Sequence, residues 1–173
     1  MLLALFLRTK DIESNPPELF SDEIVNFVSA RSVIEKGHDL EGRLLPYFSD
    51  RVELRPPVYG YFSYVSSRIF GENVIGLRVP AIFFGLAAIV LVYLLTLEFF
   101  KDRDTALFAA FIMAITPWHV HYSRVGWEPA SFLPFLLLST YLFWYGVNRK
   151  KHSAIVTSFG LFTITIYTYQ AAP

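Results

Sequence analysis

Long uncharged stretches dominate the second half of the chain. Four segments contain no Asp, Glu, Lys or Arg: residues 79–97, 105–123, 129–148 and 153–173. A helix needs about 20 apolar residues to cross a bilayer, where every backbone amide must bond within the protein. The pattern therefore predicts four transmembrane helices. The first of them, VPAIFFGLAAIVLVYLLTL, has no polar side chain beyond one Tyr and one Thr.

The polar segment before these helices also has helical patterns. Ser21 suits the N-cap of a helix over about 21–36 that Gly37 closes. A second helix, over about 56–70, begins at two prolines and is rich in aromatic residues that suit a membrane–water interface. We expect both helices to lie on the outer membrane surface, joined by a loop.

The two ends of the chain are apolar and abrupt. Residues 1–7, MLLALFL, are too short to span a bilayer, so we interpret them as the end of a first transmembrane helix that is truncated. Residues 8–78 then form one extracytoplasmic loop that contains the two interfacial helices, and residues 79–173 form the four transmembrane helices. Either the chain is a fragment, as its abrupt end also indicates, or its start was set too late in the coding sequence.

Composition supports a membrane protein. Hydrophobic residues make up 54% of the chain and charged residues 17%, against about 25% charged in typical soluble domains. The net charge of zero gives no sign of a nucleic-acid partner. Because there is no cysteine, disulfides and thiolate metal sites are excluded.

Basic residues in the short loops predict the orientation. Loop 98–104 and loop 149–152 are rich in Lys and Arg, whereas loop 124–128 contains only Arg124. Basic loops stay in the cytoplasm. Residues 124–128 and the long segment 8–78 should then both lie outside.

Several charged residues on the predicted outer side are candidates for chemistry. Asp22 and Glu23 suit the first turn of a helix, where acids complement the dipole, and this is compatible with one of them acting as a base on a hydroxyl. Arg55, held before Pro56 and Pro57, is either a phosphate-binding guanidinium or an anchor to lipid headgroups. Arg68 and Arg78 are interpreted as such anchors.

The segment PWHVHYSRVGWEP adds a second group of candidates. Arg124 and Glu128 are four residues apart and either pair on a helix or contribute to a site with Asp22. His119 and His121 are weak metal candidates, because residues two apart on a helix point in different directions.

Five motifs in order resemble a family of membrane glycosyltransferases. They are SDE at the head of a helix, RPPVYGYF, FGENVIGLRVPA, ITPWHVHYSRVGWEP and LFTITIYTYQAAP. The chain resembles the protein O-mannosyltransferase and aminoarabinose transferase superfamily over nearly its whole length. The resemblance implies an all-α polytopic membrane protein: a multi-spanning type-C glycosyltransferase-like bundle with two juxtamembrane helices in the first outer loop.

The resemblance also implies an activity. Such enzymes transfer a sugar from a polyprenyl phosphate carrier to an acceptor hydroxyl of a protein, lipid or glycan outside the cytoplasm. The chain is then expected in the plasma membrane as a multi-pass protein with its site facing outward. Transfer should invert the anomeric carbon. Which sugar and acceptor are used, and whether a divalent metal takes part, stay open; no other cofactor is implied.

The family's functional positions match particular residues of this chain. Asp22 matches the acid that serves as catalytic base, with Glu23 beside it. Members of the family often carry Lys before two prolines at the position of Arg55. Arg55 keeps the positive charge, but its planar guanidinium presents a fork of N–H donors where Lys presents a single point charge. Tyr59 joins Arg55 as a substrate-binding candidate. Arg124 and Glu128 fall at the second outer loop, where some relatives carry Asp in place of Glu.

Two other functions stay open. A transporter or flippase would need charged residues or broken helices at mid-span, and the predicted spans have Pro117 and Pro134 but no central charge. A non-catalytic membrane scaffold would not need Asp22 and Arg55. As an enzyme, the fragment alone is expected to be inactive, because its relatives complete the site with later helices.

Overall fold

The structure is a computed structural model that describes residues 1–43, 48–49 and 54–169. Within these residues the chain is almost wholly helical. The helices are α1 (Leu2–Thr9), α2 (Ser21–Lys36), α3 (Val58–Phe70), α4 (Val74–Phe100), α5 (Arg103–Ile115), α6 (Pro117–Tyr122), α7 (Pro129–Arg149) and α8 (His152–Thr165). Two short strands, β1 (Phe48–Ser49) and β2 (Leu54–Arg55), pair antiparallel.

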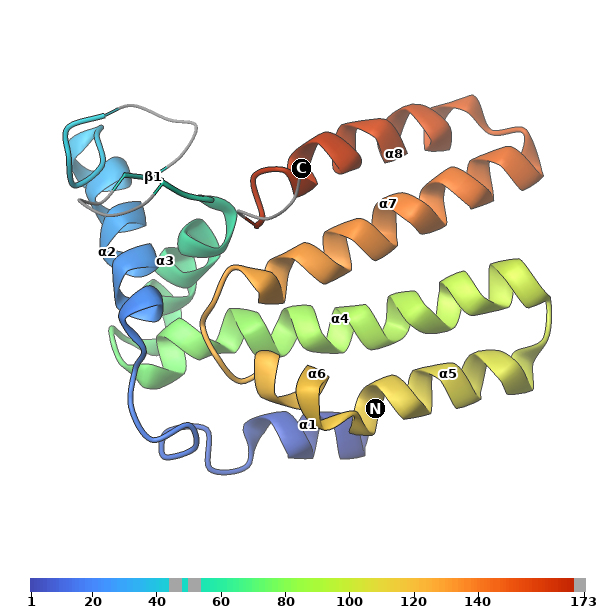
Figure 1. Ribbon diagram of the computed structural model, residues 1–173, viewed down its shortest axis with the longest axis horizontal. Helices are drawn as coiled ribbons and strands as arrows, with labels where there is room; N and C mark the ends of the chain where they lie inside the picture. Colours follow the sequence, from blue (N-terminus) through green and yellow to red (C-terminus); the bar gives the residue numbers. More distant parts are fainter. Residues whose placement is uncertain (44–47, 50–53, 170–173) are drawn as a thin grey trace.

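The chain runs back and forth through a layer of helices. Figure 1 shows α4, α5, α7 and α8 side by side along the molecule, with α2 and α3 across one end. Helix α4 packs against α3, α5 and α7, and α8 packs on α7. The turns between α4 and α5 and between α7 and α8 therefore lie at the end opposite α2 and α3 (Figure 1).

A small buried cluster holds three of these helices together beside α2. Tyr59 of α3, Ala81 and Phe84 of α4 and Ala130 of α7 form it, with Phe135 packed against it. Because α3 follows Arg55 and α7 follows Glu128, this cluster fixes the chain directly after both residues.

Two of the four predicted transmembrane segments are long, apolar helices. Helices α4 and α7 have the length and composition to cross a bilayer, while α8 is a shorter apolar helix. The residues 170–173 that end the fourth predicted span lie outside the described residues. Crossing of the membrane stays a prediction for these helices and for α5 and α6.

The prediction of one continuous helix over 105–123 is wrong. The chain forms α5 up to Ile115, leaves helical geometry at Thr116 and begins α6 at Pro117. Proline has no N–H to donate to the preceding turn, and it disfavours helical geometry in the residue before it. The break gives α6 its own direction beside α4 (Figure 1).

The first part of the chain differs from the prediction in two details. The N-cap of α2 is Phe20 rather than Ser21, and the carboxylate of Glu23 accepts the Phe20 N–H at 3.0 Å. Residues 38–55 are predicted to be a loop, yet β1 and β2 pair there. Helix α2 has the predicted bounds and α3 begins at Val58, two residues after the predicted start, while the position of both on a membrane surface stays a prediction.

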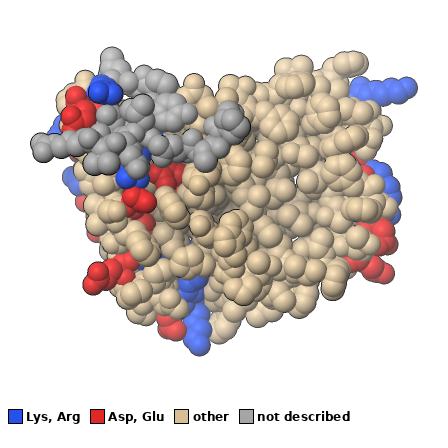
Figure 2. Space-filling model, viewed as in Figure 1, with Lys and Arg blue, Asp and Glu red and all other residues tan. Residues whose placement is uncertain are grey.

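Charged side chains are unevenly distributed over the face of the molecule in Figure 2. On the face in Figure 2, charged side chains gather at the α2–α3 end and at the opposite end, with a broad uncharged band between them. Large apolar side chains of α5 and α8, including Phe108, Phe111 and Phe159, are exposed. An exposed apolar band between two charged rims is the surface that a bilayer covers.

Candidate functional site

Three of the predicted residues meet at the α2–α3 end. The guanidinium Nη1 of Arg55 lies 3.0 Å from Oδ1 of Asp22 and 3.6 Å from Oε1 of Glu128. Asp22 is in the first turn of α2, Arg55 is in β2 and Glu128 immediately precedes α7. One cation therefore bridges two carboxylates from distant parts of the sequence.

These three side chains differ in their access to solvent. The side chain of Asp22 is 31% exposed, that of Arg55 12% and that of Glu128 6%. Burial raises the pKa of Glu128, and the guanidinium of Arg55 opposes this shift. Asp22 is thus the carboxylate of the pair that an incoming substrate can reach.

A cavity of roughly 160 Å³ lies beside Asp22. Its lining comes from the start of α2 and from residues 121–127: Phe20, Asp22, His121, Tyr122, Val125 and Trp127. The rings of Tyr122 and Trp127 stack with centroids 5.7 Å apart. A carboxylate at the edge of an aromatic hollow suits a ligand with both hydroxyl groups and apolar faces.

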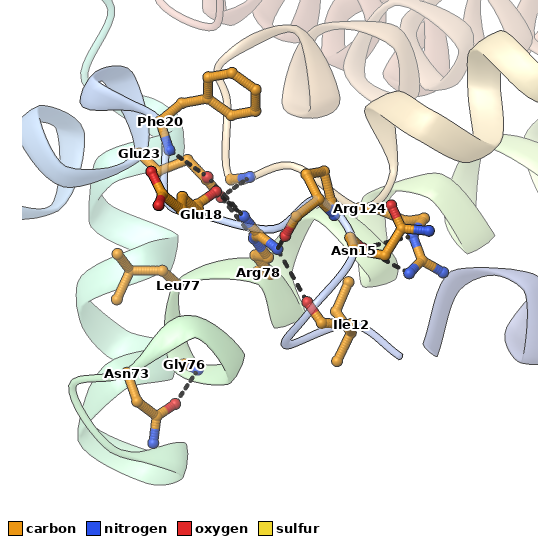
Figure 3. Close-up of polar contacts among 12 residues, drawn as sticks. Ile12, Asn15, Glu18, Phe20, Glu23, Asn73, Gly76, Leu77, Arg78 and Arg124 are labelled. Atoms are coloured by element: carbon orange, nitrogen blue, oxygen red, sulfur yellow. Dashed lines mark hydrogen bonds and ion pairs between the residues drawn. The ribbon is translucent and has the colours of Figure 1, made fainter. Parts of the chain in front are cut away.

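Glu23 points away from this cavity into the protein and is wholly buried. Its oxygens accept hydrogen bonds from Arg78 and from the backbone N–H groups of Phe20 and Gly126. Figure 3 shows Arg78 at the centre of this network. The adjacent acids Asp22 and Glu23 therefore have different surroundings.

Arg124 and Tyr59 are buried and bonded to backbone carbonyl groups. Arg124 donates to the carbonyls of Leu7, Lys10 and Asn15. The Tyr59 hydroxyl donates to the Leu77 carbonyl at 2.9 Å. Neither contact joins the Asp22–Arg55–Glu128 cluster, so substrate contact by either residue stays a prediction.

The two histidines have separate positions. His119 is buried, with Nδ1 2.7 Å from Nη2 of Arg8, whereas His121 is exposed and lines the cavity beside Asp22. In the part of the chain that the structure describes, no three His, Cys, Asp or Glu side chains cluster as metal ligands would.

Arg78 has a role that the sequence interpretation missed. It is interpreted above as a headgroup anchor, yet its side chain is wholly buried at the first turns of α4. A usable signal was present in the sequence: Val74, Ile75 and Leu77 precede Arg78, so apolar residues stand on both sides of it, and α4 includes them all. A cation inside an apolar helix needs a partner, and that partner is Glu23.

The exposed apolar band and the two long apolar helices indicate a helical membrane protein, and the Asp22–Arg55–Glu128 cluster lies at one end of its helices. The chain belongs to the dolichyl-phosphate-mannose-protein mannosyltransferase family, whose model matches residues 54–172. This confirms the resemblance seen in the sequence. The match includes Arg55 and Glu128 and begins after Asp22.

Two relatives match a similar share of the chain. A protein of Bacillus subtilis (strain 168) named "Putative mannosyltransferase YkcB" is 29% identical over 124 residues, which are 69% of this chain and 17% of the relative. An "Uncharacterized protein" of Aquifex aeolicus (strain VF5) is 28% identical over 124 residues, 71% of this chain and 24% of the relative. The chain thus spans less than a quarter of the length of either relative. No solved structure matches it.

Proposed function

We propose that this chain provides part of the active site of a membrane glycosyltransferase that uses a polyprenyl-phosphate-linked sugar. The acceptor is a hydroxyl group of a protein, lipid or glycan outside the cytoplasm. Family membership supports glycosyl transfer in general and a lipid-linked donor in a membrane. The observation that carries the finer proposal is the Asp22–Arg55–Glu128 cluster.

Asp22 is the proposed base. A carboxylate beside a cavity can take the proton from an acceptor hydroxyl as its oxygen attacks the anomeric carbon. The bond between that carbon and the phosphate oxygen breaks, and the polyprenyl phosphate leaves as an anion. Attack from the face opposite the phosphate inverts the anomeric carbon.

Arg55 is the proposed phosphate-binding residue. Its planar fork of N–H donors suits phosphate oxygens, and a positive charge stabilises the anion that leaves. The carboxylate of Glu128 contacts the same guanidinium nitrogen of Arg55 as Asp22 does, so Glu128 helps to hold this guanidinium next to the proposed base. No protonated acid is required, because a phosphate leaves readily as an anion.

The site's location suits a lipid carrier. A polyprenyl tail stays in the bilayer, so the phosphate of the donor lies at headgroup depth. The cluster lies at the charged α2–α3 end, next to the uncharged band of the helices (Figure 2). The protein would then be a multi-pass plasma-membrane protein with this end outside the cytoplasm.

Replacing the proposed base tests the function. In the full-length protein, Asp22→Asn should lower transfer of radiolabelled mannose from polyprenyl-phosphate mannose by about 10²–10⁴-fold, because an amide cannot accept the proton. Membrane insertion should be unchanged. Glu13→Gln, which neutralises an exposed carboxylate on the same segment, is the control. Full transfer by Asp22→Asn would rule out Asp22 as the base.

A further inference from the structure

Glu23 is the most densely bonded carboxylate among the described residues of the α2–α3 end. Its Oε1 accepts from Arg78 Nε at 3.0 Å and from the Gly126 N–H at 2.7 Å. Its Oε2 accepts from the Phe20 N–H at 3.0 Å and from Arg78 Nη2 at 3.1 Å. One side chain therefore joins the start of α2, the first turns of α4 and the loop before α7.

Arg78 uses its whole guanidinium in this arrangement. Besides the two bonds to Glu23, Nη1 donates to the carbonyls of Ile12 and Pro16, each at 2.9 Å, and Nη2 donates to the Glu18 carbonyl at 2.7 Å. A guanidinium has five N–H groups, and these bonds occupy all of them. Figure 3 shows the donors directed at the segment before α2 and at Glu23.

Gly126 fits against Glu23 only because it has no side chain. A Cβ there would lie 2.9 Å from the Leu77 carbonyl oxygen, 3.0 Å from Oε1 of Glu23 and 3.3 Å from the Tyr59 hydroxyl. The nearest of these atoms is backbone, which cannot swing aside. A methyl group would therefore push residues 124–128 away from Glu23.

The two ends of this link each adjoin a residue of the proposed site. Glu23 directly follows Asp22, and Gly126 is two residues before Glu128. A buried ion pair adds little to stability, because desolvation offsets most of its attraction. Its better-attested effect is to favour one arrangement of the chain over others.

We infer that Glu23, Arg78 and Gly126 are positioning residues, which set the spacing of Asp22 and Glu128 around Arg55. We call these three residues the Glu23 link. The inference rests on the proposed function, since it assigns Glu23 to holding the base in place rather than to the reaction itself. It joins the two outer segments through one buried carboxylate.

A crosslinking experiment measures the spacing without any assay of activity. The chain has no cysteine, so Asp22→Cys and Glu128→Cys introduce a single reactive pair into it. Both native carboxylates approach the same nitrogen, so a short bifunctional thiol reagent should join the two cysteines in the full-length protein. Any cysteine outside this chain is first replaced by serine.

Gly126→Ala is the deciding change in that background. It should abolish the crosslink, because the added methyl group displaces the loop that carries position 128. Gly160→Ala makes the same change in α8, where an added Cβ meets no atom within 4 Å, and should leave the crosslink intact. An unchanged crosslink in Gly126→Ala overturns the inference, and so does failure of that variant alone to accumulate.

Kinetics separate positioning from binding. With the native residues at 22 and 128, Gly126→Ala should lower kcat about 100-fold, as misplacement of reacting groups by about 1 Å does, and should leave KM for polyprenyl-phosphate mannose within about twofold. Arg78→Lys keeps the charge but loses the guanidinium fork, so it should also lower kcat and leave KM nearly unchanged. Arg68→Lys, at an exposed arginine, is its control.

The two assays distinguish the inference from the proposed function. Loss of the crosslink with normal transfer would leave the Glu23 link in place and remove Asp22 and Glu128 from the reaction. Retention of the crosslink with reduced transfer would refute the link while leaving the proposed function untouched.

Discussion

Arg55 lies between two carboxylates, and this position explains why the residue type matters there. Its Nη1 approaches the carboxylates of both Asp22 and Glu128, whereas the guanidinium of Arg78 is fully engaged with Glu23 and backbone carbonyls. Like charges close together favour protonation of one of them. Arg55 therefore lies beside the proposed base, Asp22, as well as being the proposed phosphate contact.

Arg55→Ala should raise the KM for polyprenyl-phosphate mannose about tenfold or more, because charged hydrogen bonds contribute about 1.5–3 kcal/mol. Arg55→Lys should restore part of the loss, since it returns the charge without the fork. Steady-state kinetics over a range of donor concentrations provide the measurement. A KM that stays at the wild-type value in Arg55→Ala would mean that Arg55 does not bind the donor.

Glu128 predicts a pH dependence. Burial raises its pKa above the ordinary value of 4.5, so it takes up a proton at a pH where an exposed glutamate stays charged, and its attraction for Arg55 is then lost. The acidic limb of kcat/KM should lie above pH 4.5 in the wild type and move to lower pH in Glu128→Gln. The measurement is kcat/KM across pH 4–8; coincident limbs would exclude Glu128 as the titrating group.

The raised pKa of Glu128 also makes the stability of the fold depend on pH. The folded chain binds the Glu128 proton more tightly than the unfolded chain does, so this group favours folding at low pH. That contribution is lost as the pH rises through the folded-state pKa. Glu128→Gln should therefore remove a destabilising contribution at neutral pH.

Helix α4 depends on its first residues for its place between α3 and α7. The Asn73 side chain accepts the Gly76 N–H at 3.0 Å and donates to the Phe70 carbonyl at 3.2 Å. It thus caps α4 and joins it to the end of α3. Arg78 lies about one turn further along α4, so the cap also helps to fix the position of Arg78 in the Glu23 link.

Asn73→Ala should lower the free energy of unfolding by about 1 kcal/mol, because it leaves the first turn of α4 without a side-chain acceptor. Asn73→Ser should retain most of the stability, since serine is also a good N-cap. Thermal unfolding of the detergent-solubilised protein compares the two. Equal melting temperatures for the alanine variant and the wild type would show that the cap contributes nothing.

The arrangement of the whole chain gives a clear expectation for topology. The basic turns after α4 and α7 lie at one end of the molecule, and the Asp22–Arg55–Glu128 cluster lies at the other (Figure 1). Basic loops are kept in the cytoplasm, so the cluster should face outward.

Labelling in intact cells tests this orientation. A membrane-impermeant thiol reagent should label Glu13→Cys directly, and should label Lys150→Cys only after the membrane is permeabilised. Both positions are exposed. Labelling of Lys150→Cys in intact cells would reverse the orientation and move the proposed site to the cytoplasmic side.

The sequence by itself determined most of the long helices. Uncharged runs of sufficient length defined α4 and α7, because a charge inside lipid is costly and an apolar helix is the simplest span. Proline and glycine marked the limits of α2 and α3. Pro117 was visible too, but only the chain's actual path showed that it divides one predicted helix into α5 and α6.

Only the tertiary structure decided the surroundings of the two adjacent acids. Asp22 and Glu23 look alike in sequence, yet one lines a cavity with Arg55 at hand and the other is buried against Arg78. Their partners come from segments far along the chain, and local pattern holds no information on which distant groups will meet. A helix turns about 100° per residue, so neighbouring side chains face different surroundings. The packing of α2 against the rest of the chain determines that Asp22, and not Glu23, faces the cavity.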